Sequence, residues 1–381
     1  MKLALVTETY FPQVNGVSRA LGQLVQYLRS NGDRVSLFHP RYPGDGADEE
    51  SPGVHQHAFR SVPLPFYPDV RLPLVTPLRL RRLIAADQPD LVHVATEGSL
   101  GWSALRAALK LNLPTVTSYH TNFAQYAGSY GAGVAMPLVW RYLRWFHNAG
   151  RSTFCPTPSI AWNLRKKGFK NVVIWGRGVD CDRFNPDKRD ESLRRRLGFE
   201  PQETVLVYMG RIAREKNLDV LADAFRSLHA ERPDIRLLVV GDGPYLKHLQ
   251  RALPQGAVFV GCKLGDELVA HVASADLMVF PSLSETFGNV VLEGMAAGLP
   301  VVGFDAPGPR DIIQDGITGR VVYDMSAADL ARIVREVLDV PGLLREMGHR
   351  ALIYARGQSW DQVNSVVRNT YGEVLEKVRS G

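Results

Sequence analysis

The sequence predicts an α/β protein of two domains, each a Rossmann-like unit built on a parallel β-sheet that helices cover on both faces. Short apolar runs, which are typical of strands, alternate with longer amphipathic stretches, which are typical of helices. The runs are nearly continuous in Val, Leu and Ala, as in KLALV and DLVHV, and this favours strands buried on both faces of a parallel sheet. The alternation stops in the polar, turn-rich residues 176–203 and then begins again, so we expect the interdomain linker there.

The elements follow one another in both halves of the chain. In the first half we expect strands at residues 2–8, 34–40, 90–96 and 114–121, and helices at residues 18–32 and 100–112. In the second half we expect strands at residues 204–211, 235–243, 257–261, 277–282 and 300–304, and helices at residues 217–230, 244–253, 266–274 and 288–298. A last amphipathic helix spans residues 359–380, with Ser359 as its N-cap.

Length and composition exclude several classes of protein. The 381 residues, of which 45% are hydrophobic, suffice for two cores of ordinary size. No run of 18 apolar residues occurs, and the N-terminal MKLALVTETYFP is typical of a strand rather than a signal peptide, so we expect a cytoplasmic protein. Cys155, Cys181 and Cys262 lie far apart and form no CxxC pair, so they suggest neither a disulfide framework nor a zinc site.

The positive charge is concentrated in the first half of the chain. Residues 1–182 carry 20 Lys and Arg against 12 Asp and Glu, whereas the remainder carries 25 against 27. The excess lies in three clusters, at residues 79–82, 141–144 and 165–170. Such clusters fit an anionic membrane surface or an acidic acceptor, and equally a solvated helix face. No nucleic-acid recognition motif accompanies them, so we expect no nucleic-acid partner.

Two stretches of the second half predict a diphosphate site, because loops at the carboxyl ends of parallel strands form the ligand crevice of open α/β sheets. The first stretch is the loop after residues 204–209, where Arg211 can bind phosphate as a fork and Lys216 as a point charge. Taken alone, these cations are equally explained by surface salt bridges with Glu215.

The second stretch, PSLSETFGNVVLEG, ends a strand and opens a helix directly. The backbone N–H groups of Phe287, Gly288 and Asn289 at this helix N-terminus form an anion site, and the glycine lets a ligand approach the backbone. Glu285 is placed to accept hydrogen bonds from sugar hydroxyls, and Glu293 to hold a ribose diol. For either glutamate alone, capping or solvation is the simpler explanation.

The motifs of the whole chain resemble the retaining glycosyltransferases of family 4. The resemblance rests on the E-x7-E pattern from Glu285 to Glu293 and on FPQVNGVSRA, SYHTNF, WGRGVDCDRFNP, GRIAREKNLD, VVGDGP and PGPRDIIQDGITG. It implies a GT-B fold, in which the parallel sheets of two Rossmann-like domains face each other across a cleft. It also implies domain boundaries at residues 1–182 and 183–357, with the helix of residues 358–381 completing the first domain. Within the family, the chain looks most like bacterial α-mannosyltransferases and sulfoquinovosyltransferase-type glycolipid enzymes.

The resemblance also assigns roles to single residues. Gly16 matches the glycine that lets the backbone approach the donor, and His120 matches an active-site histidine that contacts the donor sugar. Arg211 and Lys216 match a pair that stabilises the departing diphosphate in place of a metal ion, so we expect neither a metal nor a cofactor. The segment that begins at Val260 falls where family members hold the base through backbone groups.

Other motifs are given no role in the site. The residues around Gly16 lack the GxGxxG pattern, which disfavours NAD-dependent chemistry. Asp242 in GDGP is explained by a turn. His55 and His57 form an HxH that we place in a polar loop without a third ligand, so we expect no metal there.

The sequence therefore predicts a retaining hexosyltransferase that moves a sugar from a nucleotide-sugar donor to a lipid or glycan acceptor. GDP-mannose is the preferred donor and a UDP-sugar the alternative. Two other functions stay open: a nucleotide-sugar epimerase of the same fold, which would convert the donor without an acceptor, and an inactive nucleotide-sugar-binding protein, which would not turn it over. Peripheral attachment to the inner face of the plasma membrane also stays open.

Overall fold

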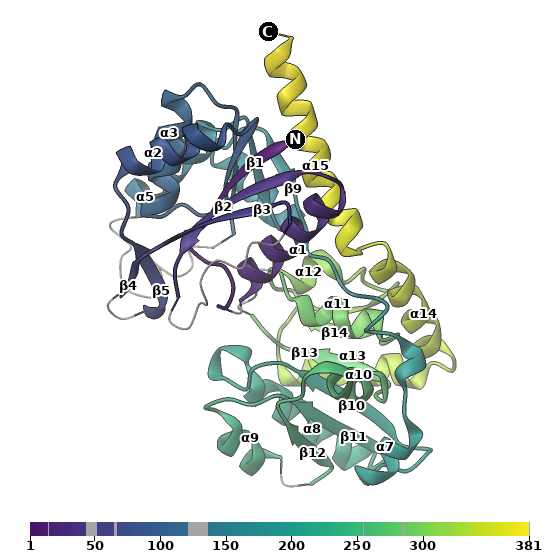
Figure 1. Ribbon diagram of the computed structural model, residues 1–381. Coiled ribbons are helices and arrows are strands. Elements are labelled where there is room, and N and C mark those ends of the chain that lie inside the picture. Colours follow the sequence, from purple (N-terminus) through teal and green to yellow (C-terminus); the bar gives the residue numbers. More distant parts are fainter. Residues whose placement is uncertain are drawn as a thin grey trace. The chain divides into compact units, whose positions relative to one another are not determined.

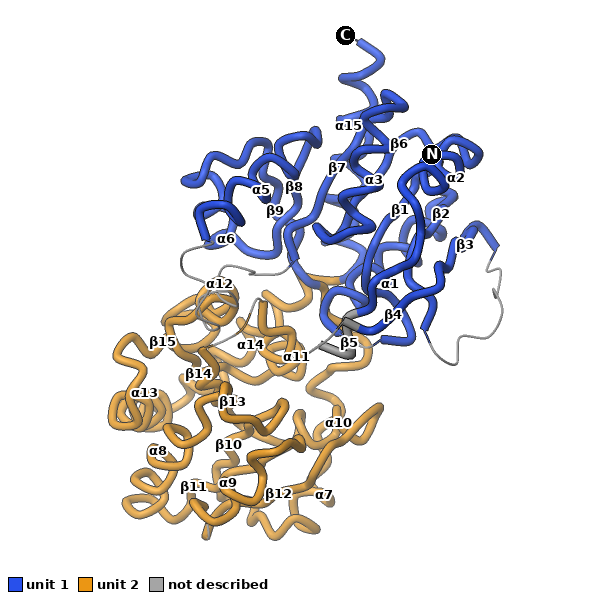
Figure 2. The backbone as a smooth tube through the Cα atoms, turned by 90° about the vertical axis from the view of Figure 1, so that its left-hand side faces the viewer, with its two compact units in different colours: residues 1–177, 360–381 blue, residues 178–359 orange. Residues whose placement is uncertain are grey.

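A computed structural model describes residues 1–13, 15–42, 52–64, 67–120, 136–253, 255–283, 285 and 287–380. The chain divides into two compact units (Figure 2). Unit 1 comprises residues 1–177 and 360–381, and unit 2 comprises residues 178–359. The sequence places the first boundary after residue 182 instead. Val179 nevertheless belongs to unit 2, because it packs in the core of that unit and pairs with Ser359.

Unit 1 holds a seven-stranded parallel sheet in the order β3-β2-β1-β6-β7-β8-β9, together with a separate hairpin of β4 and β5 (Figure 1). Its strands are β1 (Lys2–Val6), β2 (Arg34–Pro40), β3 (Val54–Phe59), β4 (Ser61–Leu64), β5 (Tyr67–Pro73), β6 (Leu91–Val94), β7 (Thr115–Ser118), β8 (Ser152–Cys155) and β9 (Val172–Ile174). Its helices are α1 (Gly16–Ser30), α2 (Pro77–Asp87), α3 (Ser99–Lys110), α5 (Met136–Asn148), α6 (Pro158–Lys166) and α15 (Trp360–Arg379).

Helices cover both faces of this sheet because successive side chains of a strand point to opposite faces. Leu3 and Leu5 of β1 pack with α1 and α15 on one face. Ala4 and Val6 of the same strand pack with α2 and α3 on the other face. The C-terminal helix therefore completes the core of unit 1, although 182 residues of unit 2 precede it in the chain.

Unit 2 holds a six-stranded parallel sheet in the order β12-β11-β10-β13-β14-β15. Its strands are β10 (Thr204–Met209), β11 (Ile235–Val240), β12 (Ala257–Gly261), β13 (Leu277–Phe280), β14 (Val301–Phe304) and β15 (Gly319–Val322). Its α-helices are α7 (Glu191–Arg196), α8 (Leu218–Glu231), α9 (Leu246–Ala252), α10 (Gly265–Ala273), α11 (Asn289–Ala296), α12 (Pro309–Ile312), α13 (Ala327–Asp339) and α14 (Leu343–Arg356), and two 3-10 turns are η2 (Pro186–Lys188) and η3 (Arg214–Lys216).

The predicted fold class of two α/β domains with parallel sheets is confirmed, and one local interpretation is wrong. Residues 54–59 form the edge strand β3, paired in parallel with β2, and not a polar loop. His55 and His57 alternate there with Val54, Gln56 and Ala58, so the histidines are the polar half of a strand pattern. Among the described helices, none combines the length and the apolar composition needed to cross a membrane.

Candidate active site

The candidate donor site lies at the carboxyl ends of β10 and β13, which are neighbours in the sheet of unit 2. From β10 the chain proceeds outward through β11 to β12, and from β13 it proceeds in the opposite direction through β14 to β15. The strand order therefore reverses between β10 and β13, and ligands of open α/β sheets bind outside such a reversal. The loops after these two strands carry the two sequence motifs that predict phosphate binding.

An ion pair joins the two loops. The ammonium of Lys216, at the end of η3, donates to Oε1 of Glu285, in the loop after β13. The hydroxyl of Ser282 donates to the same carboxylate oxygen at 3.0 Å. The side chains of Lys216 and Glu285 are only 17% and 19% exposed, so the pair is shielded from water more than a surface salt bridge is. Lys216 and Glu285 thus meet, although they are 69 residues apart.

Arg211 lies in the same loop as Lys216 but extends into solvent. Its side chain is 69% exposed, and its guanidinium lies 4.0 Å from the carboxylate of Glu215. The loop beneath it is fixed, because the hydroxyl of buried Tyr208 donates to the carbonyl oxygen of Arg211 at 3.0 Å. Burial raises the pKa of Tyr208, and the negative charges of Glu285 and Glu215 raise it further. The phenol therefore stays a hydrogen-bond donor, and the exposed guanidinium has room to turn toward an anion.

Two glycines of the GDGP motif let the loop after β11 pack against this cationic loop. A Cβ atom at Gly241 would lie 1.9 Å from the carbonyl oxygen of Gly210, and one at Gly243 would lie 2.2 Å from that of Ile212. The φ angles of +147° and +157° at these glycines also disfavour other residues. The motif is thus more than a chain reversal, because it holds the loop that carries Arg211.

The N-terminus of α11 begins close to Glu285, and among the described residues no side chain caps it. Its N-cap residue, Gly288, has a left-handed φ of +86° and, as a glycine, has no side chain that could cap the helix. Phe287 is buried in the core of unit 2, and the Oδ1 atom of Asn289 is buried without a hydrogen-bond partner among the described residues. The N–H groups of the first helical turn carry partial positive charge. This helix end is therefore suited to an anionic group.

A neighbouring glycine keeps this helix end in place. A Cβ atom at Gly308, in the loop after β14, would lie 2.5 Å from the carbonyl oxygen of Phe287. The φ of +92° at Gly308 is left-handed as well. The close approach of this loop to the start of α11 therefore requires glycine, both because a Cβ atom would collide with the backbone and because the φ angle is left-handed.

Glu293 and Val260, the two remaining residues of unit 2 that were predicted to bind the donor, are not ordinary surface residues. Glu293 lies one turn inside α11 and is only 7% exposed, so solvation does not explain it. Val260 lies in β12 at an irregularity of the ladder: Val239 pairs with Phe259, and Val240 pairs with Gly261. Val260 is thus the extra residue of a bulge, and bulges redirect backbone groups out of the regular ladder.

His120 follows β7 in unit 1 and is buried, with 5% exposure. A terminal nitrogen of Arg177 donates to its Nδ1 atom at 3.1 Å. Burial lowers the pKa of His120 well below 6.5, and the charge of Arg177 lowers it further. The imidazole is therefore neutral, and because Nδ1 accepts, its proton lies on Nε2, which is buried without a partner among the described residues.

Arg177 is itself buried, with 4% exposure, and its guanidinium carbon lies 5.6 Å from the ring centroid of Trp175. Desolvation lowers its pKa to about 10, so the side chain keeps its charge at neutral pH. Arg177 lies within the WGRGVDCDRFNP motif, from which no role for it was predicted. Its distance of 57 residues from His120 along the chain leaves no local signal for this contact.

The strand order of unit 1 also reverses, between β1 and β6. Beside this reversal, the carboxylate of Glu8 binds the N-terminus of α3. Glu8 accepts backbone N–H bonds from Gly98, Leu100 and Gly101 at the start of α3, at 3.0, 2.7 and 3.4 Å. Desolvation raises the pKa of Glu8. Anions other than this side chain are therefore kept from the N-terminus of α3.

Gly16 begins α1, beside the same reversal. Asn15 caps that helix by accepting hydrogen bonds from the N–H groups of Val17 and Ser18. A Cβ atom at Gly16 would have no neighbour within 4 Å. The described residues thus leave open space above Gly16, which is what close approach of a ligand to this backbone requires.

In sum, the structure brings Lys216, Glu285 and the start of α11 together, and it leaves Arg211 extended into solvent. His120 and Gly16 belong to the other unit. Ser282, Arg177 and Gly308 were not predicted as site residues. The roles of Arg177 and Gly308 depend on contacts distant in sequence, whereas Ser282 lies only three residues from Glu285.

Two family models match the chain. Residues 14–183 match the model described as Glycosyltransferase Family 4, and residues 189–353 match the model described as Glycosyl transferases group 1. The first covers most of unit 1, and the second covers most of unit 2.

Named relatives extend the comparison over most of the chain. A GDP-mannose-dependent alpha-mannosyltransferase of Mycobacterium tuberculosis is 38% identical over 324 residues, which cover 84% of this chain and 83% of that protein. The sulfoquinovosyl transferase SQD2 of Arabidopsis thaliana is 33% identical over 377 residues, which cover 97% of this chain and 72% of that protein. The structure of a sucrose-phosphate synthase from Thermosynechococcus elongatus superimposes with a TM-score of 0.77 over 99% of both chains, at 20% sequence identity.

Proposed function

The chain belongs to glycosyltransferase family 4 and has the GT-B fold, and from this premise we propose that it transfers a hexose from a nucleotide-sugar donor with retention of anomeric configuration and without a metal ion. The observation that carries the proposal is the contact between Lys216 and Glu285, beside a helix N-terminus that no described side chain caps. A diphosphate and a sugar need a cation, exposed amides and a carboxylate in one place, and these groups supply them.

Charge stabilisation is the main contribution to catalysis in this proposal. As the bond to the sugar breaks, negative charge grows on the departing diphosphate, and Lys216, Arg211 and the amides of α11 stabilise it. Glu285 holds Lys216 in position and accepts hydrogen bonds from sugar hydroxyls. The acceptor hydroxyl attacks from the face that the diphosphate leaves, and a phosphate oxygen takes its proton.

His120 contributes through its neutral state. With Nδ1 accepting from Arg177, the Nε2–H group is a fixed donor toward a sugar hydroxyl. A neutral imidazole avoids placing a positive charge beside the oxocarbenium-like sugar of the transition state. Arg177 is in this view a positioning residue, since it acts through the histidine ring.

GDP-mannose is the donor that we propose, and three relatives named GDP-mannose-dependent alpha-mannosyltransferase support it. A UDP-sugar is the alternative, because relatives named for the transfer of sugars other than mannose, a sulfoquinovosyl transferase and an alpha-monoglucosyldiacylglycerol synthase, cover similar shares of the chain. The backbone of Val260, displaced by the bulge in β12, is the group that we propose for the base. The acceptor that we propose is a lipid or a glycan.

Replacement of the two cations tests the charge-stabilising role. Lys216→Ala is expected to lower kcat/KM by about 10²–10³, the loss typical of a removed transition-state donor, and Arg211→Ala to lower it in the same direction. Arg226→Ala is the matched control, because Arg226 forms an exposed ion pair with Asp223 on α8. Turnover near that of the control in both variants, with the fold intact, would contradict the role.

Donor, metal and stereochemistry are tested together with the unmodified protein. Calorimetry with GDP-mannose, UDP-glucose, UDP-galactose and ADP-glucose identifies the donor by its affinity. Assays in the presence of a chelator test metal independence, and the anomeric coupling in the product tests retention. Conversion of the donor to an epimer without an acceptor would favour the epimerase, and the absence of both hydrolysis and transfer would favour an inactive binding protein.

We propose in addition that unit 1 meets anionic membranes through a patch on α5 and α6. Asn148, at the end of α5, donates to the carbonyl oxygen of Gly168, just after α6, at 2.9 Å, and the ammonium of Lys167 lies 4.3 Å from the ring centroid of Trp140, so the two helices are neighbours. The patch comprises exposed Leu138, Arg141, Arg144, Trp145, Trp162 and Lys166. Exposed tryptophans beside arginines suit the interface between headgroups and acyl chains.

Vesicles that contain an anionic lipid test the patch. The double variant Arg141→Gln/Arg144→Gln is expected to bind about thirtyfold more weakly, from about 1 kcal/mol per basic residue near the surface. The matched control is Arg79→Gln/Arg82→Gln, which removes two exposed charges from α2. Equal losses in both pairs would contradict a specific patch, and unchanged binding in both would contradict electrostatic attachment.

A further inference from the structure

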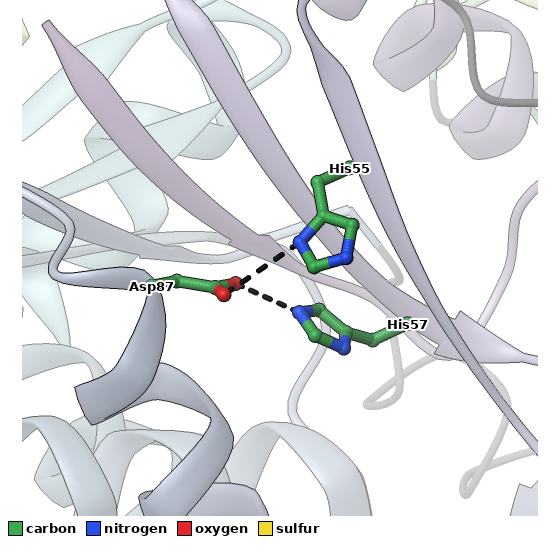
Figure 3. Close-up of side chains that lie close together, drawn as sticks. All are labelled: His55, His57 and Asp87. Carbon is green, nitrogen blue, oxygen red and sulfur yellow. Dashed lines mark hydrogen bonds and ion pairs between the residues drawn. The ribbon is translucent and has the colours of Figure 1, made fainter.

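Three side chains with metal-binding atoms converge in unit 1, apart from the groups assigned to the active site. His55 and His57 come from β3, and Asp87 is the last residue of α2 (Figure 3). The Nε2 atom of His57 lies 2.7 Å from Oδ2 of Asp87, and the Nδ1 atom of His55 lies 3.6 Å from Oδ1. One ligand atom from each residue lies within 4.8 Å of the others.

The backbone explains why these groups meet. Residues 55 and 57 are two apart on a strand, so both side chains leave the same face of the sheet. That face is covered by α2, whose Leu80 and Ile84 pack in the core together with Phe38 of β2. The carboxylate of Asp87 thereby arrives over the edge strand.

His57 is the most firmly placed of the three. It lies opposite Phe38 in the ladder, and the two rings stack with centroids 4.4 Å apart at an interplanar angle of 16°. The side chains of His57 and Asp87 are 13% and 12% exposed, whereas that of His55 is 56% exposed. Two ligands are thus held in place before an ion arrives, and the third is accessible from solvent.

The local charge also favours a cation. Asp87 ends a helix, where the last carbonyl groups carry partial negative charge. His55 and Asp87 line an open cavity of about 640 Å³, which gives an ion access. Lys2 and Arg34 line the same cavity, but both are exposed, so water and salt screen their repulsion.

We propose that His55, His57 and Asp87 bind one divalent transition-metal ion, with Zn²⁺ as the best match. Two imidazoles and one carboxylate form a common three-ligand set for zinc, in which water takes the fourth position. Bonds of about 2.0–2.1 Å in a tetrahedron place ligand atoms about 3.3 Å apart. The observed separations, 2.7 Å from His57 to Oδ2 and 3.6 Å from His55 to Oδ1, lie on either side of that value, and one ligand atom from each of the three residues lies within 4.8 Å of the others.

The place of the site in the fold gives it a role distinct from the glycosyl transfer. The cavity is lined by residues at the amino ends of three parallel strands, Lys2 of β1, Arg34 of β2 and His55 of β3. Ligands of open α/β sheets bind at the carboxyl ends. A bound ion would tie the edge strand β3 to the end of α2, so it stabilises unit 1 and leaves the proposed metal-free chemistry unchanged.

The test is a Zn²⁺ titration of the untagged full chain after treatment with a chelator. Competition with a chromophoric zinc indicator gives stoichiometry and affinity. The chain carries Cys262→Ser, because the exposed Cys262 thiol could bind the ion by itself. We expect one ion per chain, and His55→Ala is expected to weaken binding by about 100-fold, since loss of a ligand exceeds the effect of losing an outer partner. His55 is the suitable position because its exposed side chain is not needed for packing.

His248→Ala is the matched control. His248 forms an imidazole–carboxylate contact with Asp219 at 2.9 Å, but a second imidazole is absent from the described residues around that pair. This variant is expected to bind Zn²⁺ as the parent chain does. Zn²⁺ should also raise the melting temperature of the parent and the control, but not that of His55→Ala. Absence of saturable binding, or equal binding by His55→Ala and the parent, would overturn the proposal.

Discussion

The buried histidine of β6 gives a quantitative prediction about pH and stability. His93 is fully buried, with Nδ1 2.7 Å from the hydroxyl of Tyr371 in α15 and Nε2 2.6 Å from the hydroxyl of Ser118 in β7. Desolvation lowers its pKa to about 3, against 6.5 for an unperturbed histidine. The folded chain thus keeps this ring neutral at pH values where the unfolded chain protonates it.

The sign and size of the change in stability with pH follow from this difference in pKa between the folded and unfolded chain. Because the folded pKa is depressed, the unfolded state binds the extra proton below pH 6.5, and stability falls as the pH falls toward 3. Between pH 8 and pH 5 the loss from His93 alone is about 2 kcal/mol, or 1.5 pH units at about 1.36 kcal/mol each. With a urea m-value of about 2 kcal/mol/M, the unfolding midpoint moves by about 1 M.

Tryptophan fluorescence measures this pH-dependent unfolding in unit 1, the unit that contains His93. All six tryptophans of the chain belong to unit 1, so the signal reports on that unit rather than on unit 2. The tryptophans are Trp102, Trp140, Trp145, Trp162, Trp175 and Trp360. Urea unfolding of the parent and of His93→Gln at pH 8 and pH 5 should show a midpoint shift that is smaller by about 1 M in the variant.

A control separates titration from packing. Ser118→Ala removes a hydrogen bond of the ring but leaves the imidazole, so it should lower stability at both pH values and keep the full pH dependence. If His93→Gln instead retained the pH dependence of the parent, the argument from burial would be wrong.

Two further predictions concern the candidate active site. Arg177→Met removes the charge and the donor next to His120, so the pKa of His120 should rise and the acidic limb of the pH profile of kcat/KM should move to higher pH. Arg177→Lys should move that limb part of the way back. An acidic limb that does not move in Arg177→Met would exclude the positioning role. Gly308→Ala places a Cβ atom 2.5 Å from the carbonyl oxygen of Phe287 at a residue with a left-handed φ. The substitution should lower the free energy of unfolding by about 1–3 kcal/mol and weaken donor binding measured by calorimetry. An unchanged affinity for the donor would show that the start of α11 does not need this contact.

The sequence predicts the strands of both sheets well where they are continuous apolar runs, because burial on both faces dictates their composition. It does not predict β8, β9 or β15, which have only four, three and four residues. It also fails at β3, whose His55 and His57 break the apolar run. The hairpin of β4 and β5 was not predicted, since Pro63 and Pro73 in its strands are typical of turns.

The candidate site divides in the same way. The positions of Lys216 and Glu285 after their strands are readable from the sequence, and the parallel-sheet rule places them at one edge. Their contact is not readable, because it depends on β10 lying next to β13, which strand spacing does not encode. His120 is identified only by family resemblance, and its neutral state only by the contact with Arg177, which is distant in sequence.

The two strand-order reversals of the molecule are alike in topology and opposite in charge. In unit 1 the carboxylate of Glu8 occupies the N-terminus of α3, and Asn15 caps α1, so the helix ends beside that reversal already have acceptors. In unit 2 the start of α11 is not capped by any side chain that the structure describes, and Lys216 lies on the neighbouring loop. An incoming diphosphate would be repelled by the first arrangement and stabilised by the second. This difference supports the proposal that the phosphates bind to unit 2.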